Sequence, residues 1–408
     1  MDEFTIFTAA LNLNAPWFIE KVRLEKGERK EQIHITISHK KGSCFNYEGQ
    51  EYPVYDHRDR VWRHLDFFQY ECYLHVAVPR VKTKDNSVRL IAVPWAAPGS
   101  SFTLLFELKI MELVHNGMNQ SKAGKTLGIS AKRVARVINR RVASALCEQS
   151  LDTVKKLSID ETSAKKGHNY LTILCDRELK KVVGVSEGKD SQAVADALID
   201  MEVRGAKREK VKTITMDMST GYIAAVAKYL NQAAIIFDRF HIMKKMNEAV
   251  DTIRRQEQAK CKEDFKRTRY WWLYNEDKLK DDQRERIQRL SKAYPNIGEA
   301  YRLKELLRSV LDQAYYDHRL YWLNDWIKQA VKSKLEPILK FVNMLHNHWY
   351  GIKTFFKKLA TNAYAENVNL KIQEIKRSAR GFRNMNNFRL LIYFHLGGLN
   401  LGLPTKYD

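Results

Sequence analysis

Cysteine is scarce in this sequence, and the five cysteines that occur are scattered. They form no Cys-x-x-Cys pair, and an odd count at irregular spacing argues against a disulfide framework. We therefore expect a cytoplasmic protein, since the cytoplasm is reducing. No apolar run is long enough to span a bilayer. The first residues, Met1-Asp-Glu-Phe-Thr-Ile6, also lack the basic-then-apolar pattern of a signal peptide. We expect no association with a membrane.

Acidic residues are in deficit. The 408 residues include 70 Lys and Arg against 48 Asp and Glu, which gives a formal charge of +22. This excess favours a polyanionic partner, most often nucleic acid. A hydrophobic content of 44% indicates a globular chain, and the length leaves room for several domains. Charge alone does not separate a nucleic-acid-binding protein from a merely basic one, so the motifs must decide.

Residues 1–95 predict a small β-rich module. Residues 32–38 alternate apolar and polar side chains as a half-buried strand does, and 67–81 and 88–93 are further strand candidates. Potential zinc ligands occur here, but structural zinc sites usually take their ligands in close pairs, and no such pair is present. These residues are Cys44, His57, His64, Cys72 and His75. We therefore expect no zinc.

Residues 102–146 change to a helical period and predict a helix-turn-helix. Gly128-Ile-Ser130 forms the turn, with Ser130 as the N-cap of a second helix. That helix buries three aliphatic side chains and has a basic outer face, which is the layout of a recognition helix in a major groove. An ordinary helical hairpin with a solvated face is the alternative. The residues expected to contact DNA are Lys132, Arg133, Arg136, Asn139 and Arg140.

Residues 155–240 predict an α/β core. The order strand, strand, strand, helix, strand, helix, strand is that of the ribonuclease-H-like fold. The first strand ends at Asp160 and the fourth ends at Asp217. Strands one and four are neighbours in that fold, so the two aspartates would face each other. Strand alternation points Glu161 to the opposite face.

The rest of the chain predicts helices. Residues 241–356 show no convincing strand and predict an all-α insertion whose tryptophans either form its core, which we favour, or stack on exposed bases. Residues 357–396 contain an amphipathic helix with Glu366 in its first turn and Gly381 as its stop, and 397–408 form a tail. We expect Lys376, Arg377 and Arg380 to contact DNA phosphates.

Two carboxylates at strand ends and a third on a helix can share a pair of divalent cations. Such a site catalyses in-line phosphoryl transfer. Asp160, Asp217 and Glu366 are therefore the candidate catalytic and metal-binding residues, with two Mg²⁺ or Mn²⁺ ions as cofactors. Asp238 and His241 follow the fifth strand. They either orient a ligand or a water from behind, or are a helix N-cap and a surface histidine.

Several motifs together resemble the insertion-sequence transposases of the ISL-three group, over about residues 55–396. The motifs are Ile159-Asp-Glu161, Asp217-Met-Ser219, Asp238-Arg-Phe-His241, Glu366-Asn-x-Asn369 and the run Ile375-Lys-Arg-x-Ala-Arg-Gly-Phe-Arg-Asn384. The resemblance implies a DDE transposase, with Asp160, Asp217 and Glu366 as the triad. It also implies a helical insertion between the second aspartate and the glutamate.

The sequence departs from this family at one place. Family members usually carry an N-terminal zinc-binding module with paired Cys or His ligands. Here the match places Cys44 at one ligand position, but Tyr47 stands at its partner, and the second pair falls near Thr83 and Asn86. This departure supports the expectation that zinc is absent from the module.

The resemblance implies a function. The protein would bind the terminal inverted repeats of an insertion sequence and catalyse metal-dependent strand cleavage and strand transfer. Its partners would be the double-stranded DNA of the transposon ends and of the target, with a homodimer bringing two ends together. One alternative is a DNA-binding protein that has kept the fold without the chemistry, and another is a nuclease that only hydrolyses. The helix-turn-helix favours transposition, because it indicates site choice.

Overall fold

The computed structural model describes all residues except 1–3, 29, 166–168, 313–315, 359–362 and 404–408. At 316, 317 and 363 it describes the backbone but not the side chains. The chain forms two compact units, Met1–Arg141 with Asn400–Asp408 and Val142–Leu399. The boundary between them falls within a helix, α4 (Ala131–Glu148). No helix in the described part of the chain is both long and apolar enough to cross a lipid bilayer.

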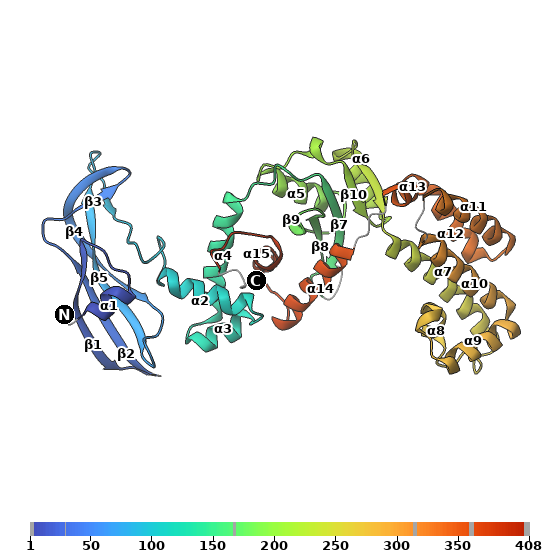
Figure 1. The fold of residues 1–408 in the computed structure, drawn as a ribbon, viewed down its shortest axis with the longest axis horizontal. Helices are drawn as coiled ribbons and strands as arrows, with labels where there is room; N and C mark the ends of the chain where they lie inside the picture. Colours follow the sequence, from blue (N-terminus) through green and yellow to red (C-terminus); the bar gives the residue numbers. More distant parts are fainter. Residues whose placement is uncertain (1–3, 29, 166–168, 313–315, 359–362, 404–408) are drawn as a thin grey trace. The chain divides into compact units, whose positions relative to one another are not determined.

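The N-terminal unit begins with a six-stranded sheet (Figure 1). The sheet order is β1-β2-β5-β4-β3, with β6 paired to β5. In β2, Ile33, Ile35 and Ile37 are buried while the residues between them are half-buried, as the alternating sequence predicts. A short helix, α1, precedes the sheet and was not expected. The elements are α1 (Thr5–Ala10), β1 (Trp17–Lys26), β2 (Glu31–His39), β3 (Cys44–Tyr47), β4 (Gln50–Arg63), β5 (Glu71–Lys82) and β6 (Val88–Leu90).

Three helices follow the sheet and form the predicted helix-turn-helix. They are α2 (Leu104–His115), α3 (Gln120–Leu127) and α4. Gly128 ends α3 in the left-handed region at φ 70°, a conformation that costs glycine little. The hydroxyl of Ser130 accepts the amide of Arg133, so the predicted N-cap is confirmed. Val134, Val137 and Ile138 of α4 are buried, which leaves the basic residues between them on the outer side.

The second unit is built on a five-stranded sheet of order β11-β10-β7-β8-β9. β7, β8 and β9 are antiparallel, whereas β10 lies parallel to β7 and β11 parallel to β10. The prediction that the first and fourth strands are neighbours is therefore confirmed. The strands are β7 (Lys156–Ser163), β8 (Tyr170–Asp176), β9 (Lys181–Glu187), β10 (Thr213–Met216) and β11 (Ala234–Phe237).

The predicted end of the first strand is wrong. β7 does not stop at Asp160 but continues to Ser163, because Glu161, Thr162 and Ser163 still pair with β8 after the pairing with β10 has ended. The polar composition of this stretch hides the continuation of the strand, because the side chain of Thr162 is polar and yet buried and hydrogen-bonded.

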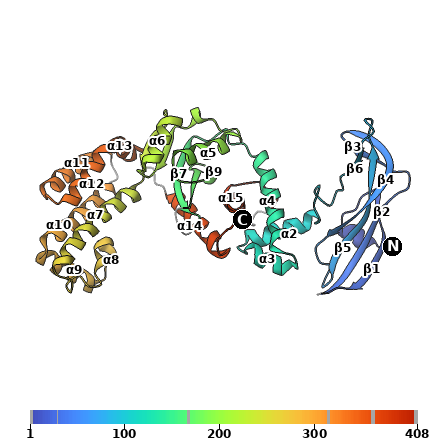
Figure 2. The same ribbon diagram turned by 180° about the vertical axis from the view of Figure 1, so that it is seen from behind.

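Four helices pack around this sheet (Figure 2). α5 contacts β8 and β9, and α6 packs on α5. α14 contacts β7, and α15 contacts β9. Arg380 and Gly381 have positive φ angles just after α14, so the predicted helix stop is confirmed. The helices are α5 (Ser191–Glu202), α6 (Thr220–Tyr229), α14 (Ala363–Ser378) and α15 (Met385–Leu396), and a 3₁₀ turn spans Arg208–Lys210.

The segment between β11 and α14 is helical in its described part. Trp272 and Trp326 are fully buried in its core, as favoured from the sequence, whereas Trp322 is 46% exposed. The long helix α7 starts directly after β11, and α13 returns to pack on β11. The helices are α7 (Arg239–Lys260), α8 (Arg269–Leu273), α9 (Asp281–Ala293), α10 (Pro295–Leu311), α11 (Tyr316–Lys332), α12 (Glu336–Asn347) and α13 (Trp349–Lys358), with a 3₁₀ turn at Glu276–Lys278.

The contact of α13 with β11 depends on a glycine. A Cβ atom on Gly351 would lie 2.4 Å from Cδ2 of Phe237. We expect Gly351→Ala to lower the free energy of unfolding by roughly 1–3 kcal/mol through overpacking, as measured by urea denaturation. Gly221→Ala in α6 is the matched control, because its Cβ would meet its nearest neighbours at ordinary distances of 3.5–3.6 Å. Equal stability of the two variants would contradict this account.

Candidate functional site

Three aspartates lie in one row across three neighbouring strands. In the parallel pair β7–β10, Lys156 is opposite Thr213 and Ser158 opposite Thr215. Continuing this register by two residues places Asp160 opposite Asp217. In the pair β10–β11, Met216 is opposite Phe237, so the next residues are Asp217 and Asp238. Residues at the same level of parallel strands point to the same side of the sheet. The register therefore places the three aspartates at the same edge of the sheet.

The electrostatics agree with this row. Burial, aided by the charges of Asp217 and Asp238, raises the pKa of Asp160 to about 6, although His241 and the backbone amide of Glu161 act against this rise. The pKa of Glu366 is raised by burial and by the charge of Asp238, again opposed by His241. Asp160 thus feels the charge of Asp217 directly. Glu366 is linked to these two acids only through Asp238 and His241, whose charges act on it as well as on Asp160.

Asp238 both caps a helix and faces the other acids. Its Oδ1 accepts the amide of Phe240 at 3.2 Å, which makes it the N-cap of α7. The residue is only 3% exposed, and its Oδ2 has no hydrogen-bond partner among the described residues. Nδ1 of His241 lies 3.4 Å from that oxygen, as an ion pair without hydrogen-bond geometry. The N-cap alternative is therefore confirmed for Asp238, whereas its role in orienting a ligand or a water stays a prediction.

The same contact affects His241. Burial lowers the pKa of this imidazole, but the carboxylate of Asp238 and the charges of Asp217 and Asp160 outweigh burial and raise it. The imidazole thus compensates part of the negative charge that the row of aspartates concentrates.

The third predicted carboxylate stands on α14. Glu366 lies in the first turn of this helix and its side chain is exposed. One turn further on, Nδ2 of Asn369 donates to Oδ2 of Asp160 at 2.7 Å. Gln373 then donates to Oγ1 of Thr162 at 2.7 Å, and Nζ of Lys376 donates to the carbonyl of Ser163 at 2.6 Å. We call Asn369, Gln373 and Lys376 the polar seam, because they join α14 to β7.

The polar seam contradicts the predicted role of Lys376. Lys376 was expected to contact DNA phosphates, but its ammonium is engaged with the backbone of β7. Arg377 and Arg380, the other basic residues expected to contact phosphates, are exposed. Asn369 and Gln373 were not assigned to the site from the sequence, since only the fold shows that β7 is their partner.

The acids provide suitable donors for a hard divalent cation. Mg²⁺ and Mn²⁺ prefer carboxylate oxygens, and the unpartnered buried Oδ2 of Asp238 is an acceptor that a cation could satisfy. In the described part of the chain, however, no three His, Cys, Asp or Glu side chains converge closely enough to hold an ion. Both oxygens of Asp160 are engaged, one with the amide of Glu161 and the other with Asn369. The donor chemistry fits a metal, although the acids are not gathered around a common point.

Only part of the basic face of the predicted recognition helix is exposed to solvent. Lys132 and Arg136 are exposed. Arg133 instead lies 4.3 Å from the ring centre of Phe102 and donates to Ser101. Arg140 pairs with Glu107, a fully buried carboxylate of α2 that also binds Arg141 at 3.0 Å. Two arginines at the end of the basic face are thus internal counter-ions.

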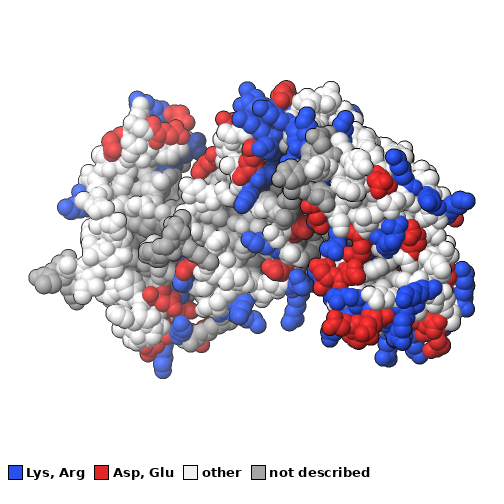
Figure 3. Space-filling view, turned by 45° about the vertical axis from the view of Figure 1, so that its right-hand side comes forward, with Lys and Arg blue, Asp and Glu red and all other residues white. Residues whose placement is uncertain are grey.

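The basic excess does not form a uniform surface on the helical insertion. Figure 3 shows Lys and Arg side chains interleaved with Asp and Glu on this part of the molecule. Many of these charges are paired along the same helix, as Arg302 with Glu299 and Arg308 with Glu305 are. Such pairs leave fewer unpaired cations for phosphate binding than the number of Lys and Arg residues indicates.

The potential zinc ligands of the N-terminal module are spread over the sheet. His57 lies against His39, with their Nε2 atoms 2.9 Å apart, and His75 lies against His34. His64 is buried and bonded to Thr103. Burial raises the pKa of the Cys72 thiol to about 12, whereas Cys44 is exposed. These side chains do not converge on one point.

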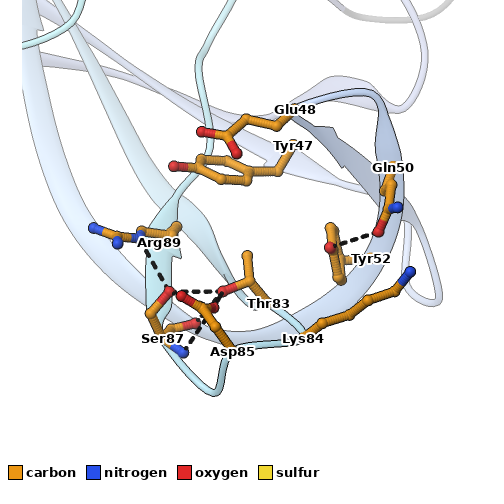
Figure 4. A pocket seen from close by; sticks show the side chains of 9 residues that line it. All are labelled: Tyr47, Glu48, Gln50, Tyr52, Thr83, Lys84, Asp85, Ser87 and Arg89. Carbon is orange, nitrogen blue, oxygen red and sulfur yellow. Dashed lines mark hydrogen bonds between the residues drawn. The ribbon is translucent and has the colours of Figure 1, made fainter.

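A cavity of about 330 Å³ lies where the β3–β4 and β5–β6 turns meet (Figure 4). Tyr47 and Thr83, two of the positions at which the resemblance places metal ligands, line it. Asp85 closes the second turn by accepting hydrogen bonds from Thr83 and Ser87, and these bonds lower the pKa of its carboxyl to about 2. Hydrogen bonds thus connect the residues of this turn.

Comparison with known proteins identifies the family. A transposase family model of the DDE type matches residues 157–392, and a model of the helix-turn-helix domain of transposase family ISL3 matches residues 91–142. A model of the zinc finger of the transposases of IS204, IS1001, IS1096 and IS1165 matches residues 49–85. Together these models cover the sheet of acids, the three helices and much of the N-terminal module.

Individual proteins with similar sequences are also transposases of insertion sequences. The transposase for insertion sequence element IS1001 of Bordetella parapertussis is 25% identical over 351 residues, which cover 83% of this chain and 85% of that protein. The transposase for IS1557 of Mycobacterium tuberculosis is 22% identical in two strains, over 100% of this chain and 99% of that protein. The chain belongs to the ISL3 family of insertion-sequence transposases, the group that its motifs resemble.

The zinc-finger match corrects one expectation. We expected no zinc because three of four ligand positions lack Cys or His, but residues 49–85 match the zinc-finger model of these transposases, and the match implies zinc. The expectation was wrong because it weighed the ligand positions alone and ignored the rest of the module. The described side chains bring no three ligands together, so they do not form a zinc site as they stand. No step proposed below depends on zinc.

The raised pKa of Asp160 predicts how the stability of the protein depends on pH. Its carboxyl holds a proton up to about pH 6 in the folded protein, against 3.8 for an ordinary aspartate, so stability falls as pH rises through this window. We expect Asp160→Asn, measured by thermal unfolding with a chelator present, to stabilise the protein at pH 8 by on the order of 2 kcal/mol, and less at pH 5. Asp196→Asn, at an exposed site, should show no such pH dependence. Destabilisation at both pH values would refute this account.

Proposed function

We propose that this transposase is a DDE enzyme with a ribonuclease-H-like core that binds the inverted repeats of its element, cleaves the strands and joins them to target DNA. The observation that carries the proposal is the row of Asp160, Asp217 and Asp238 across three parallel strands, with Glu366 linked to these acids through the charges of Asp238 and His241. The sheet order, with three antiparallel strands followed by two parallel ones, is that expected of a ribonuclease-H-like core.

Asp160, Asp217 and Glu366 would hold Mg²⁺ or Mn²⁺. When bound, two such ions activate an attacking oxygen and stabilise the leaving one. The chain itself supplies the fixed position of the acids. Asp160 and Asp217 are set by the backbone register, whereas Glu366 is carried on α14, which the polar seam joins to β7. The exposure of Glu366 allows it to approach once DNA and cations are present.

Asp238 and His241 act behind this triad in our proposal. Asp238 is fixed at the start of α7 by its capping bond, and its other oxygen, which faces His241 at 3.4 Å, accepts no hydrogen bond from the described residues. His241 balances negative charge at the edge of the row. Groups that contact metal ligands from behind in this way orient the ligands.

DNA would be gripped at two places. Lys132 and Arg136 of α4 are the exposed members of the basic face and would enter the major groove. Arg377 and Arg380, beyond the polar seam, would meet phosphates near the acids. Since strand transfer joins two transposon ends to one target, we propose a homodimer on double-stranded DNA.

A second candidate function is supported by one observation. No three acidic side chains in the described residues are close enough to share an ion, which would suit a transposase-derived protein that binds DNA without cutting it. The raised pKa of Asp160 and the free oxygen of Asp238 favour the enzyme, because a protein without chemistry gains nothing from such buried charge.

The triad predicts the behaviour of two neutralised acids. We expect Asp217→Asn to abolish Mg²⁺-dependent cleavage of DNA that carries the element's ends, because the shared cations lose a ligand, while binding of the same DNA in chelator is kept. Gel analysis of the cleaved strands is the measurement. Glu161→Gln is the matched control, since this neighbour of Asp160 points to the other face and should leave cleavage intact. Cleavage by Asp217→Asn at the wild-type rate would exclude the triad. Hydrolysis without strand transfer in the wild type would leave a nuclease.

The phosphate contacts predict a salt dependence. If about 6–10 phosphates are neutralised, affinity for DNA falls by roughly 10³–10⁵ between about 50 and 200 mM salt. Arg136→Ala should weaken binding and, if it contacts a phosphate, reduce the slope of log affinity against log salt by about 1. Fluorescence anisotropy measures both quantities. Arg302→Ala, which removes an arginine paired with Glu299, is the control that should leave the slope unchanged. A flat salt response would contradict the proposed contacts.

A further inference from the structure

We propose that Asn369 is a positioning residue, which sets the carboxylate of Asp160 through a hydrogen bond from α14. This inference rests on the proposed role of Asp160 as a metal ligand and adds a residue to that site. Asn369 lies 209 positions from Asp160 in sequence, and its Nδ2 is 2.7 Å from Oδ2 of that side chain. It also reaches the carbonyl of Glu161 at 3.4 Å.

The bond completes the fixation of the carboxylate. Oδ1 of Asp160 accepts the backbone amide of Glu161 at 2.8 Å, and Oδ2 accepts Asn369. With one donor on each oxygen, the plane of the carboxylate is set, and each oxygen keeps a further lone pair for a ligand. Without Asn369, the side chain of Asp160 would be held at one oxygen only and could rotate.

The chemistry of an amide suits this task. A lysine or arginine at this place would neutralise Asp160 and compete with a cation, and a second carboxylate would repel it. The neutral amide of Asn369 donates a hydrogen bond and leaves the negative charge of Asp160 in place. Because only the NH₂ group can donate to a carboxylate, the orientation of the amide follows from the contact itself.

The buried oxygen of the Asn369 amide, Oδ1, has no hydrogen-bond partner among the described residues. Buried acceptors are normally satisfied, so this oxygen is available to a water or an ion beside Asp160. The free Oδ2 of Asp238 is a second buried acceptor in the site without a partner.

Asn369 also couples the two parts of the triad. It follows Glu366 by three positions, so the two side chains lie on neighbouring parts of the same helix surface. The hydrogen bond therefore ties the turn of α14 that carries Glu366 to the strand that carries Asp160. Gln373 and Lys376 continue the polar seam but contact only Thr162 and Ser163, which are not acids. Asn369 thus positions the carboxylate of Asp160, whereas Gln373 and Lys376 on the same helix face only attach α14 to β7.

This separation provides the test. Asn369→Ala and Gln373→Ala each remove two hydrogen bonds between α14 and β7, but only the first releases Asp160. We expect Asn369→Ala to weaken Mn²⁺ binding to the full-length protein by roughly 10–100-fold, the usual effect of losing an outer-shell partner. Gln373→Ala should leave Mn²⁺ affinity within about twofold of wild type, because Gln373 does not contact Asp160. A change of this size is clearly smaller than the roughly 10–100-fold loss expected for Asn369→Ala. Isothermal titration with Mn²⁺ alone measures the affinity.

A second readout concerns the reaction. The Mn²⁺ concentration that gives half-maximal cleavage should rise for Asn369→Ala and not for Gln373→Ala, while affinity for DNA in chelator stays the same for both. Should Asn369→Ala fail to fold, Asn369→Ser keeps a polar group at this half-buried place, but it is too short to reach Asp160 and should show the same loss.

The outcomes separate the two levels of the argument. If wild type binds Mn²⁺ and Asn369→Ala binds it equally well, or if both variants weaken binding alike, Asn369 only docks the helix and the inference is overturned. If wild type binds no Mn²⁺, and Asp217→Asn cleaves DNA as wild type does, the proposed function fails and the inference fails with it. Selective weakening in Asn369→Ala supports both.

Discussion

The parallel register of β7, β10 and β11 is the constraint on which the rest of this structure depends. Three strands from distant parts of the chain are paired so that Asp160, Asp217 and Asp238 occupy one level. Like charges placed together in a partly buried site repel each other, and each would be more stable alone in water. The sheet positions them nevertheless, because Asp217 and Asp238 follow directly on the paired strands β10 and β11. Burial is the main cause of the raised pKa of Asp160, and the charges of the two other aspartates add to it.

The surrounding elements manage this concentration of charge in different ways. His241 offsets part of it with an imidazole whose pKa is raised by the acids. The N-terminus of α7 supplies an amide to Asp238, and α14 supplies an amide to Asp160. None of these groups forms a full salt bridge with Asp160 or Asp217. The site is thus organised without being neutralised, which is the state that the proposed metal-dependent chemistry would require.

The sequence predicted the parts of this arrangement that follow from periodicity. Buried strands and amphipathic helices are visible in one dimension, and the neighbourhood of Asp160 and Asp217 followed from the strand order. The continuation of β7 to Ser163 was missed, because Thr162 is polar yet buried, and its partner Gln373 lies 211 positions away. The pairing of Arg140 with Glu107 was missed for a similar reason, since a buried carboxylate cannot be recognised until its helix is packed.

Zinc is an instructive failure of the same kind. Counting ligands at four positions led to the expectation of a zinc-free module, whereas residues 49–85 as a whole match the zinc-finger model of related transposases. Polar contacts between distant residues, such as those of Asn369, stay invisible for a different reason. Their side chains obey no spacing rule, and only the docking of α14 on β7 brings them to the strand.

The attachment of the helical insertion has a mechanical consequence. Its first helix is capped by Asp238, and its last helix rests on Phe237 through Gly351, so the segment leaves and rejoins the sheet at two consecutive residues. One hydrophobic core continues from the sheet into these helices, so they and the sheet form one compact body. A change in the packing of α7 would therefore also shift the carboxylate of Asp238, because this residue is the N-cap of that helix.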